Sequence, residues 1–355
     1  MNIKNRKSNI ELLRIFACIG VIMLHFMGGG YKFVKDSSIN TLLLYYIEAI
    51  SICSVNLFML ISGYFLCSRV QSSNKKLVQL LSQYWFVSIG MYVVGIIIRK
   101  NSLGIAALIE IIIPKNYFLV FYIIVYVFSP YINIMLEHLN CNDRKRLRNL
   151  LIGIFSIYST VINVLMCFTN VNAENMNPVS RSGDSYGYSI VQFFIMYLLG
   201  ALLSKEDHFY KKSKSIILWQ SNILIIFGIA VFLDFMLLKR EFTLDVVWAY
   251  SNPLIIFSSV HIFRAFREIE MGCIKAVNSL ARASFMVYLI HPYILSMLDF
   301  SFIKNFNILQ LLFVLIILSI LTYCIGFFVY MIWELTIHKM EIIFEKRFVS
   351  EKRQS

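Results

Sequence analysis

The sequence lacks the patterns that mark a metal site, a disulfide-stabilised fold or a nucleotide-binding loop. Its seven cysteines are scattered, mostly within apolar segments and without a CxxC pair, so neither a disulfide framework nor a zinc site is expected. No Gly-rich phosphate loop and no cluster of metal-ligating residues is present, so the chain needs neither a nucleotide-binding fold nor a metal. We also find no internal repeat, which argues against a transporter built from inverted repeats.

Charged residues are scarce, at 15% of the 355 residues, whereas hydrophobic residues make up 59%. Together with a mean hydropathy of +0.71, this composition indicates an integral membrane protein, and its long apolar runs indicate helices rather than a barrel. The net charge of +13 comes from Lys and Arg in short loops between apolar runs. Such loops set membrane orientation, so the expected partner is the lipid bilayer and not a nucleic acid.

We predict an all-α, polytopic membrane bundle of about ten transmembrane helices. The apolar run near the N-terminus is too long for a signal peptide and is expected to remain as the first span. The stretch 103–113, closed by Pro114, is too short to cross and is expected to form an interfacial or re-entrant helix. The predicted spans are 10–30, 41–66, 77–98, 117–136, 149–169, 188–203, 215–238, 243–263, 283–303 and 308–335.

The loops between these spans alternate in charge. One set carries 23 Lys and Arg and the other 9, with Arg14 completing the 33, so both termini are expected in the cytoplasm. We predict one transmembrane domain over residues 1–336 and a basic cytoplasmic tail over 337–355, resting on the inner leaflet. The polar loop 170–187 is expected outside, either as a gating or partner-contacting loop or as a plain connector.

The first span carries an unusual polar stripe of Glu11, Arg14 and His25. Eleven residues separate Arg14 from His25, which brings them within about 20° of each other around the helix and about 16 Å apart along it. Cys18 lies on the same stripe, and Glu11 lies near it. Ionisable groups in hydrocarbon normally face a bundle interior or a wet cavity, so the stripe predicts a functional site. The alternative is an Arg14 that extends to the membrane surface and a structural His25.

Glu48 in the second span is expected at nearly the same depth as His25, since both lie about 8–9 Å below the outer edge. A carboxylate that pairs with the imidazole would fix its tautomer and raise its basicity for general-base catalysis. Each group could instead have a different partner. We therefore treat His25 and Glu48 as the candidate catalytic residues.

Several segments resemble the membrane acyltransferase-3 family. They are the R-x10-H pattern of Arg14 and His25, NLFMLISGYFL in the second span, NYFLVFYIIVYVFSPYINIML at 116–136, QFFIMYLLGALL at 192–203 and SFMVYLIHPYIL at 284–295. They occur along most of the chain in the family's order. Two departures are notable. Arg69 stands alone where many members have an arginine cluster, which puts a donor contact there in doubt, and Asn56 stands where Asp is frequent.

The resemblance implies transfer of an acyl group, usually acetyl, from cytoplasmic acyl-coenzyme A to a hydroxyl of a cell-surface polysaccharide or lipid-linked glycan. The expected location is the plasma or inner membrane, and acetyl-coenzyme A or another acyl-coenzyme A is a donor substrate rather than a bound cofactor. His25 would be the general base or a transient acyl carrier. Arg14 would bind the donor, with Glu11 pairing it. The alternative is a transporter for glycan intermediates that performs no covalent chemistry.

Further binding candidates lie in other spans. His291, beside Pro292, could line the same cavity or be structural at a kinked helix. Ser62 precedes a glycine and could belong to a close helix contact, whereas tyrosines near the outer entry of the fourth span could stack on a sugar or form an interfacial belt. The complete set of predicted binding residues is Glu11, Arg14, Asn56, Ser62, Arg69, Tyr117, Tyr122, Tyr288 and His291.

Overall fold

The computed structural model describes residues 7–27, 39–98, 104–114, 116–169, 187–206, 211–236, 242–300, 303 and 306–339. Throughout these ranges the regular structure is helical, and they contain no strand. The helices are α1 (Ser8–His25), α2 (Ile39–Ser51), α3 (Ser54–Leu66), α4 (Asn74–Ile97), α5 (Ile105–Ile112), α6 (Tyr117–His138), α7 (Cys141–Ile152), the π-helix η3 (Gly153–Tyr158), α8 (Ser159–Thr169), α10 (Ile190–Ser204), α11 (Lys212–Met236), α12 (Phe242–Val247), α13 (Pro253–Arg267), α14 (Lys275–Arg282), α15 (Ser284–Ser296), α16 (Ile308–Trp333) and the π-helix η7 (Glu334–His338).

Seven helical stretches within the described ranges are long and apolar enough to cross a membrane. They are Ser8–His25, Asn40–Leu66, Asn74–Ile97, Tyr117–His138, Cys141–Leu165, Lys212–Asp234 and Ile308–His338. Two shorter apolar helices, α10 and α15, coincide with predicted spans. The short α5 lies where the sequence predicted a helix too short to cross. The chain is therefore a multi-pass helical membrane protein.

The predicted span 243–263 differs from the structure, because a break at Trp248–Asn252 divides it into α12 and α13. Asn252 caps α13 by accepting a hydrogen bond from the Leu254 N–H at 3.0 Å, and Pro253 occupies the first turn. Proline in the first turn and Asn at the cap both favour a helix that starts at this point. The sequence Ser-Asn-Pro therefore starts a new helix instead of continuing one.

Side chains from distant helices satisfy the backbone at this break. The Tyr250 carbonyl accepts hydrogen bonds from the Asn56 and Gln192 amides, both at 2.9 Å, and the Ser251 carbonyl accepts one from the Ser156 hydroxyl at 2.6 Å. Gln192 also donates to the Asn56 oxygen at 3.2 Å. Unpaired backbone groups inside a membrane bundle cost several kcal/mol each, so these contacts permit the break.

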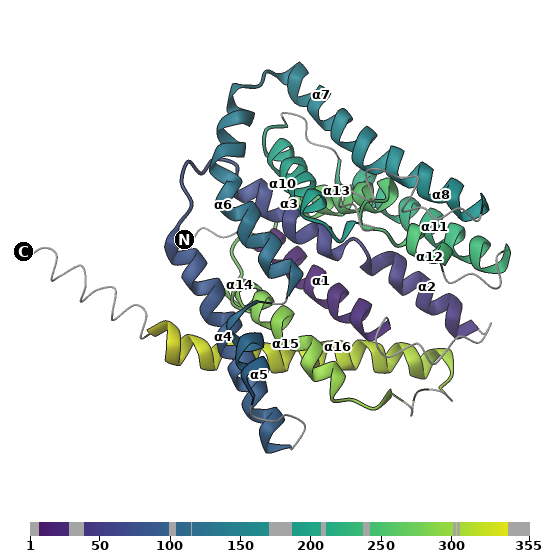
Figure 1. Ribbon diagram of the computed structural model, residues 1–355. Coiled ribbons are helices and arrows are strands. Elements are labelled where there is room, and N and C mark those ends of the chain that lie inside the picture. Colours follow the sequence, from purple (N-terminus) through teal and green to yellow (C-terminus); the bar gives the residue numbers. More distant parts are fainter. Residues whose placement is uncertain are drawn as a thin grey trace, which may run out of the picture.

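Helix α1 lies at the centre of the bundle and packs against α2, α3, α13, α14, α15 and α16. Figure 1 shows α1 between α16 on one side and α7 and α8 on the other. Its first turn is held by Ser8, whose hydroxyl donates to the Asn278 amide oxygen at 2.9 Å, and by Asn9, which donates to the Phe266 and Arg267 carbonyls at 3.0 Å each. The helix that carries the polar stripe is therefore fixed against α13 and α14.

Glycines bring α3 and α10 into close contact. A Cβ atom added to Gly63 would lie 2.0 Å from the Tyr197 carbonyl oxygen, and one added to Gly200 would lie 2.0 Å from the Leu60 carbonyl oxygen. Small residues allow membrane helices to approach backbone to backbone, which increases dispersion contacts between them. The close helix packing considered for the Ser62–Gly63 pair is therefore present at Gly63.

Candidate functional site

A cavity of about 990 Å³ opens at the end of the bundle where α1 begins and α16 ends. Helices α1, α3, α4, α6, α14, α15 and α16 contribute to its wall, as does η7. Both Lys7, before α1, and His338, at the end of η7, line it, so the first and last described segments meet at this opening. Of the eleven predicted site residues, the cavity wall contains Glu11, Arg14, Ser62, Arg69, Tyr122 and Tyr288.

Positive charge dominates the cavity wall. Among the described residues that line the cavity, five are Lys or Arg and one, Glu11, is a carboxylate, so the formal excess of the lining is five minus one, or four positive charges. Four of the five come from helix ends or the adjoining turns, which places them around the opening. The five are Lys7, Arg14, Arg69, Lys76 and Arg282. A wall of this charge favours a ligand that carries several negative charges.

Arg14 lies further along α1 than the other cations, about 10 Å beyond Lys7. Its Nη1 atom donates to Glu11 Oε2 at 2.8 Å, which is the ion pair predicted from the sequence. Glu11 is buried, whereas Arg14 is half-buried. The carboxylate thus holds the guanidinium in place while leaving its remaining N–H groups for other acceptors.

Arg282 is held at the opening in a similar way. It donates a hydrogen bond to Glu334 of η7, and its guanidinium carbon lies 5.7 Å from the centre of the Tyr330 ring. Trp333 and His338 stack nearby, with ring centres 5.1 Å apart. The end of α16 and η7 therefore form one side of the opening.

Aromatic residues form the inner end of the cavity. Tyr288 lies about 9 Å beyond Arg282 along α14 and α15, and its hydroxyl donates to the Asn116 amide oxygen at 3.0 Å. Its ring packs against Phe118 with the ring centres 4.7 Å apart. Tyr122 stacks on Phe118 in turn, at 6.2 Å. The cavity thus changes from charged at its opening to aromatic at its inner end.

Two histidines lie behind Tyr288. The centre of the His291 ring lies 5.5 Å from the centre of the Tyr288 ring. The His25 ring contacts the His291 ring edge-on, with the ring centres 4.5 Å apart. His291 is only 1% exposed, and neither of its ring nitrogens has a hydrogen-bond partner among the described residues. His25, in contrast, is exposed. The imidazole pair therefore extends from the inner end of the cavity to a surface outside it.

One hydrogen bond fixes the tautomer of His25. Its Nδ1 atom lies 3.0 Å from the Val21 carbonyl oxygen, and a carbonyl oxygen can only accept. Nδ1 therefore carries the proton in this contact. In the neutral ring Nε2 then holds the free lone pair, which is the form that a general base requires.

The predicted pair of Glu48 and His25 is not formed. Glu48 lies on α2 within electrostatic range of Asp245, and no hydrogen bond or ion pair joins it to His25 in the described structure. The two groups share a depth, but α15 packs against α1 and places His291 beside His25 instead. The neighbour of the His25 ring is therefore a second imidazole.

Three predicted binding residues lie outside the cavity wall, namely His291, described above, Asn56 and Tyr117. Asn56 supports the break before α13, as described above, and so has a structural role there. Tyr117 belongs to an aromatic cluster, with ring centres 5.6 Å from Tyr188 and 5.9 Å from Phe121. Tyr117 therefore packs among aromatic side chains and does not line the cavity.

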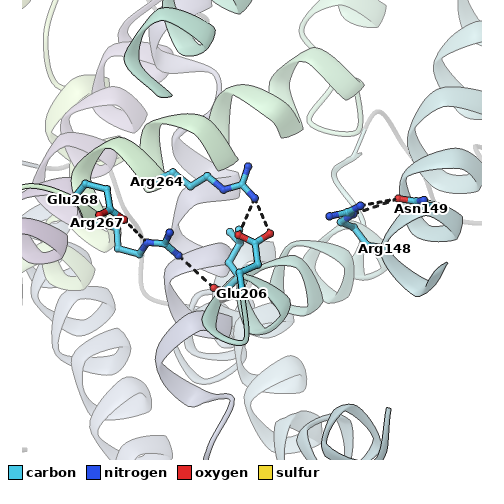
Figure 2. Close-up of polar contacts among 7 residues, drawn as sticks. Arg148, Asn149, Glu206, Arg264, Arg267 and Glu268 are labelled. Atoms are coloured by element: carbon cyan, nitrogen blue, oxygen red, sulfur yellow. Dashed lines mark hydrogen bonds and ion pairs between the residues drawn. The ribbon is translucent and has the colours of Figure 1, made fainter. Parts of the chain in front are cut away.

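Not all basic residues at helix ends belong to the cavity. Figure 2 shows Arg264 directed at Glu206, with two contacts of 2.6 and 2.8 Å, and Arg267 bonded to Glu268 at 2.9 Å. Arg267 also donates to the Leu203 carbonyl at 3.4 Å. The Arg264–Glu206 ion pair and the Arg267–Leu203 hydrogen bond link the ends of α10 and α13.

Several residues of the cavity wall were not predicted from the sequence, because they lie in or beside basic loops, and such loops also determine membrane orientation. Lys7, Lys76 and Arg282 occur in basic loops, and Gln79 and Gln83 follow Lys76 on α4 at helical spacing. That spacing of polar residues in an apolar span was the available signal. Lys7, Lys76 and Arg282 supply the positive charge that the missing arginine cluster beside Arg69 does not.

Comparison with known proteins agrees with these features. The chain matches the acyltransferase domain of the acyltransferase-3 family over residues 7–333. No curated protein and no solved structure matches the chain. Because the matched region begins before α1 and ends with α16, it includes the cavity wall except His338, the polar stripe, His25 and His291. The chain therefore belongs to the acyltransferase-3 family and is a multi-pass membrane acyltransferase.

Proposed function

We propose that the protein transfers an acyl group, normally acetyl, from acyl-coenzyme A to a hydroxyl of a cell-surface polysaccharide or lipid-linked glycan. The observation that carries this proposal is the cavity with a positively charged opening and an aromatic inner end beside the His25–His291 pair. Its charge suits the phosphates of coenzyme A, and its inner end brings a thioester toward a base. The substrates follow from family membership and this chemistry together.

The donor would enter from the charged opening. Guanidinium and ammonium groups bind phosphate strongly, and guanidinium can do so through two hydrogen bonds at once. The cavity volume lies at the upper end of the range of about 300–1,000 Å³ that is typical of small-molecule sites. Arg14, positioned by Glu11 between the opening and Tyr288, would orient the donor chain.

The reaction requires a base for the acceptor hydroxyl. In our mechanism Nε2 of His25 takes the hydroxyl proton while the hydroxyl oxygen attacks the thioester carbonyl. The tetrahedral intermediate then expels the coenzyme A thiolate, which takes that proton from the His25 imidazolium, and the new ester leaves with the acceptor. The exposed side of His25 gives the acceptor a route that does not pass through the donor cavity. His25 as an acyl carrier is the alternative, in which Nε2 itself attacks the thioester.

We place the cavity opening in the cytoplasm, where acyl-coenzyme A is available, and the acceptor on the opposite face of the plasma or inner membrane. The support is the loop asymmetry of 23 against 9 basic residues, since the more basic loops include those that line the opening. Both termini would then be cytoplasmic. The predicted tail and the loop 170–187 lie mainly outside the described residues, so their roles stay predictions.

The test uses inverted membrane vesicles from cells that produce the protein, supplied with radiolabelled acetyl-coenzyme A. We expect label in the polysaccharide or lipid-linked glycan fraction, and we expect mild alkali to release it because esters are alkali-labile. Vesicles that contain His25→Gln at equal abundance are the control and should incorporate little label. Equal incorporation with and without the protein would refute the proposal, and glycan movement without incorporation would favour the transporter.

A further inference from the structure

Gln83 is a buried amide in the cavity wall that has no assigned role. It lies on α4, is 8% exposed, and its Oε1 atom has no hydrogen-bond partner in the part of the chain that is described. A buried polar atom without a partner destabilises the folded protein. Such an atom in a native protein requires an explanation, and a ligand that completes its hydrogen bonds is one.

Gln83 continues a polar face of α4 into the cavity. Lys76, Gln79 and Gln83 all line the wall, at intervals of three and four residues that place them on one side of the helix. Lys76 stands in the first turn of α4, and Gln83 lies about 10 Å further along. The wall also contains apolar and aromatic side chains such as Phe58 and Phe118. Gln83 is thus a buried amide about 10 Å inside the charged opening.

A ligand that spans the cavity must present matching chemistry at each level. Acyl-coenzyme A carries phosphates at one end, a thioester at the other and two secondary amides in the pantetheine arm between them. An amide side chain can accept from the N–H of such a group, and a half-turn about its last bond exchanges its oxygen and nitrogen. Gln83 lies about 10 Å beyond Lys76, so an amide of the pantetheine arm can reach it when the phosphates lie at the charged opening.

We propose that Gln83 binds the pantetheine arm of the donor by accepting a hydrogen bond from one of its amide N–H groups. This inference rests on the proposed use of acyl-coenzyme A and adds the residue that recognises the middle of that molecule. Gln83 is a binding residue and takes no part in proton transfer. It selects a donor with an amide at this distance from the phosphates.

The test is a double-mutant cycle in which one change is made in the protein and the other in the ligand. Binding of each ligand to each protein is measured in detergent. Coenzyme A is compared with two analogues in which one or the other pantetheine N–H is replaced by an ester oxygen. Wild type is compared with Gln83→Met, which keeps length and shape but loses the acceptor. Gln220→Met, an exposed glutamine on α11, is the matched control.

We expect wild type to bind one of the analogues about tenfold more weakly than coenzyme A. Gln83→Met should bind coenzyme A and that analogue about equally, and both more weakly than wild type binds coenzyme A. Gln220→Met should behave as wild type. If Gln83→Met distinguishes that analogue from coenzyme A as strongly as wild type does, or if wild type distinguishes neither analogue, the proposal is wrong. Failure of wild type to bind coenzyme A at all would instead refute the proposed function, and thermal unfolding shows whether each variant is folded.

Discussion

Replacement of His25 by Gln should abolish acyl transfer while preserving the fold. The structure gives His25 one hydrogen bond, from Nδ1 to the Val21 carbonyl, and one ring contact, with His291. Loss of both would cost about 1–3 kcal/mol of folding free energy, and the Gln amide can restore the hydrogen bond. Loss of a positioned base slows a reaction about 10²- to 10⁴-fold, which corresponds to about 3–5 kcal/mol in the barrier.

The two effects are separated by measuring stability, donor binding and transfer on the same purified protein. We expect His25→Gln to have a melting temperature within a few degrees of that of wild type and to bind coenzyme A normally. Its transfer rate should fall about 10²- to 10⁴-fold. His138→Gln, an exposed histidine at the end of α6, is the matched control and should remain active. A folded His25→Gln protein with most of its transfer rate would refute the base assignment and favour transport.

The same variant distinguishes a base from an acyl carrier. Wild type mixed with radiolabelled acetyl-coenzyme A in the absence of acceptor should retain no label after rapid cold desalting near neutral pH if His25 is a base. Acid is avoided because it hydrolyses an acyl-imidazole. A carrier would give labelled protein in an amount approaching one equivalent, with release of thiol, and His25→Gln would give none. The tautomer seen here has Nε2 free for either role, so geometry alone favours neither.

Much of the fold was predictable because hydrocarbon leaves few choices to the backbone. Long apolar runs must form helices, and the predicted spans coincide with most of the described ones. The break between α12 and α13 was missed, since hydropathy counts Tyr250 and its neighbours as part of one run. The side chains of Asn56, Gln192 and Ser156, from helices far away in sequence, make that break tolerable.

The arrangement of site residues was predictable where they share a helix. Helical periodicity put Glu11, Arg14 and His25 on one face, and the ion pair of the first two is present. Depth alone suggested Glu48 as the partner of His25, but depth does not determine which way neighbouring helices are rotated. His291 is 266 residues away in the chain, so its contact with His25 depends on the packing of α15 against α1.

The remaining predictions concern the donor site, the helix packing and the orientation. Arg14→Lys keeps the charge but loses the planar fork, so we expect it to raise the KM for acetyl-coenzyme A at least tenfold, and wild-type kinetics for this variant would exclude bidentate recognition. A cysteine at Ser180 in a Cys-free background should react with an impermeant reagent from outside intact cells, and reaction only after permeabilisation would reverse the proposed orientation. Gly200→Val should lower stability by about 1–3 kcal/mol or more, because its Cβ would lie 2.0 Å from the Leu60 carbonyl oxygen and must separate α10 from α3. Gly228→Val is its control, since a Cβ there meets no atom within 4 Å among the described residues, so equal thermal stability of the two variants would show that the close α3–α10 contact does not stabilise the bundle.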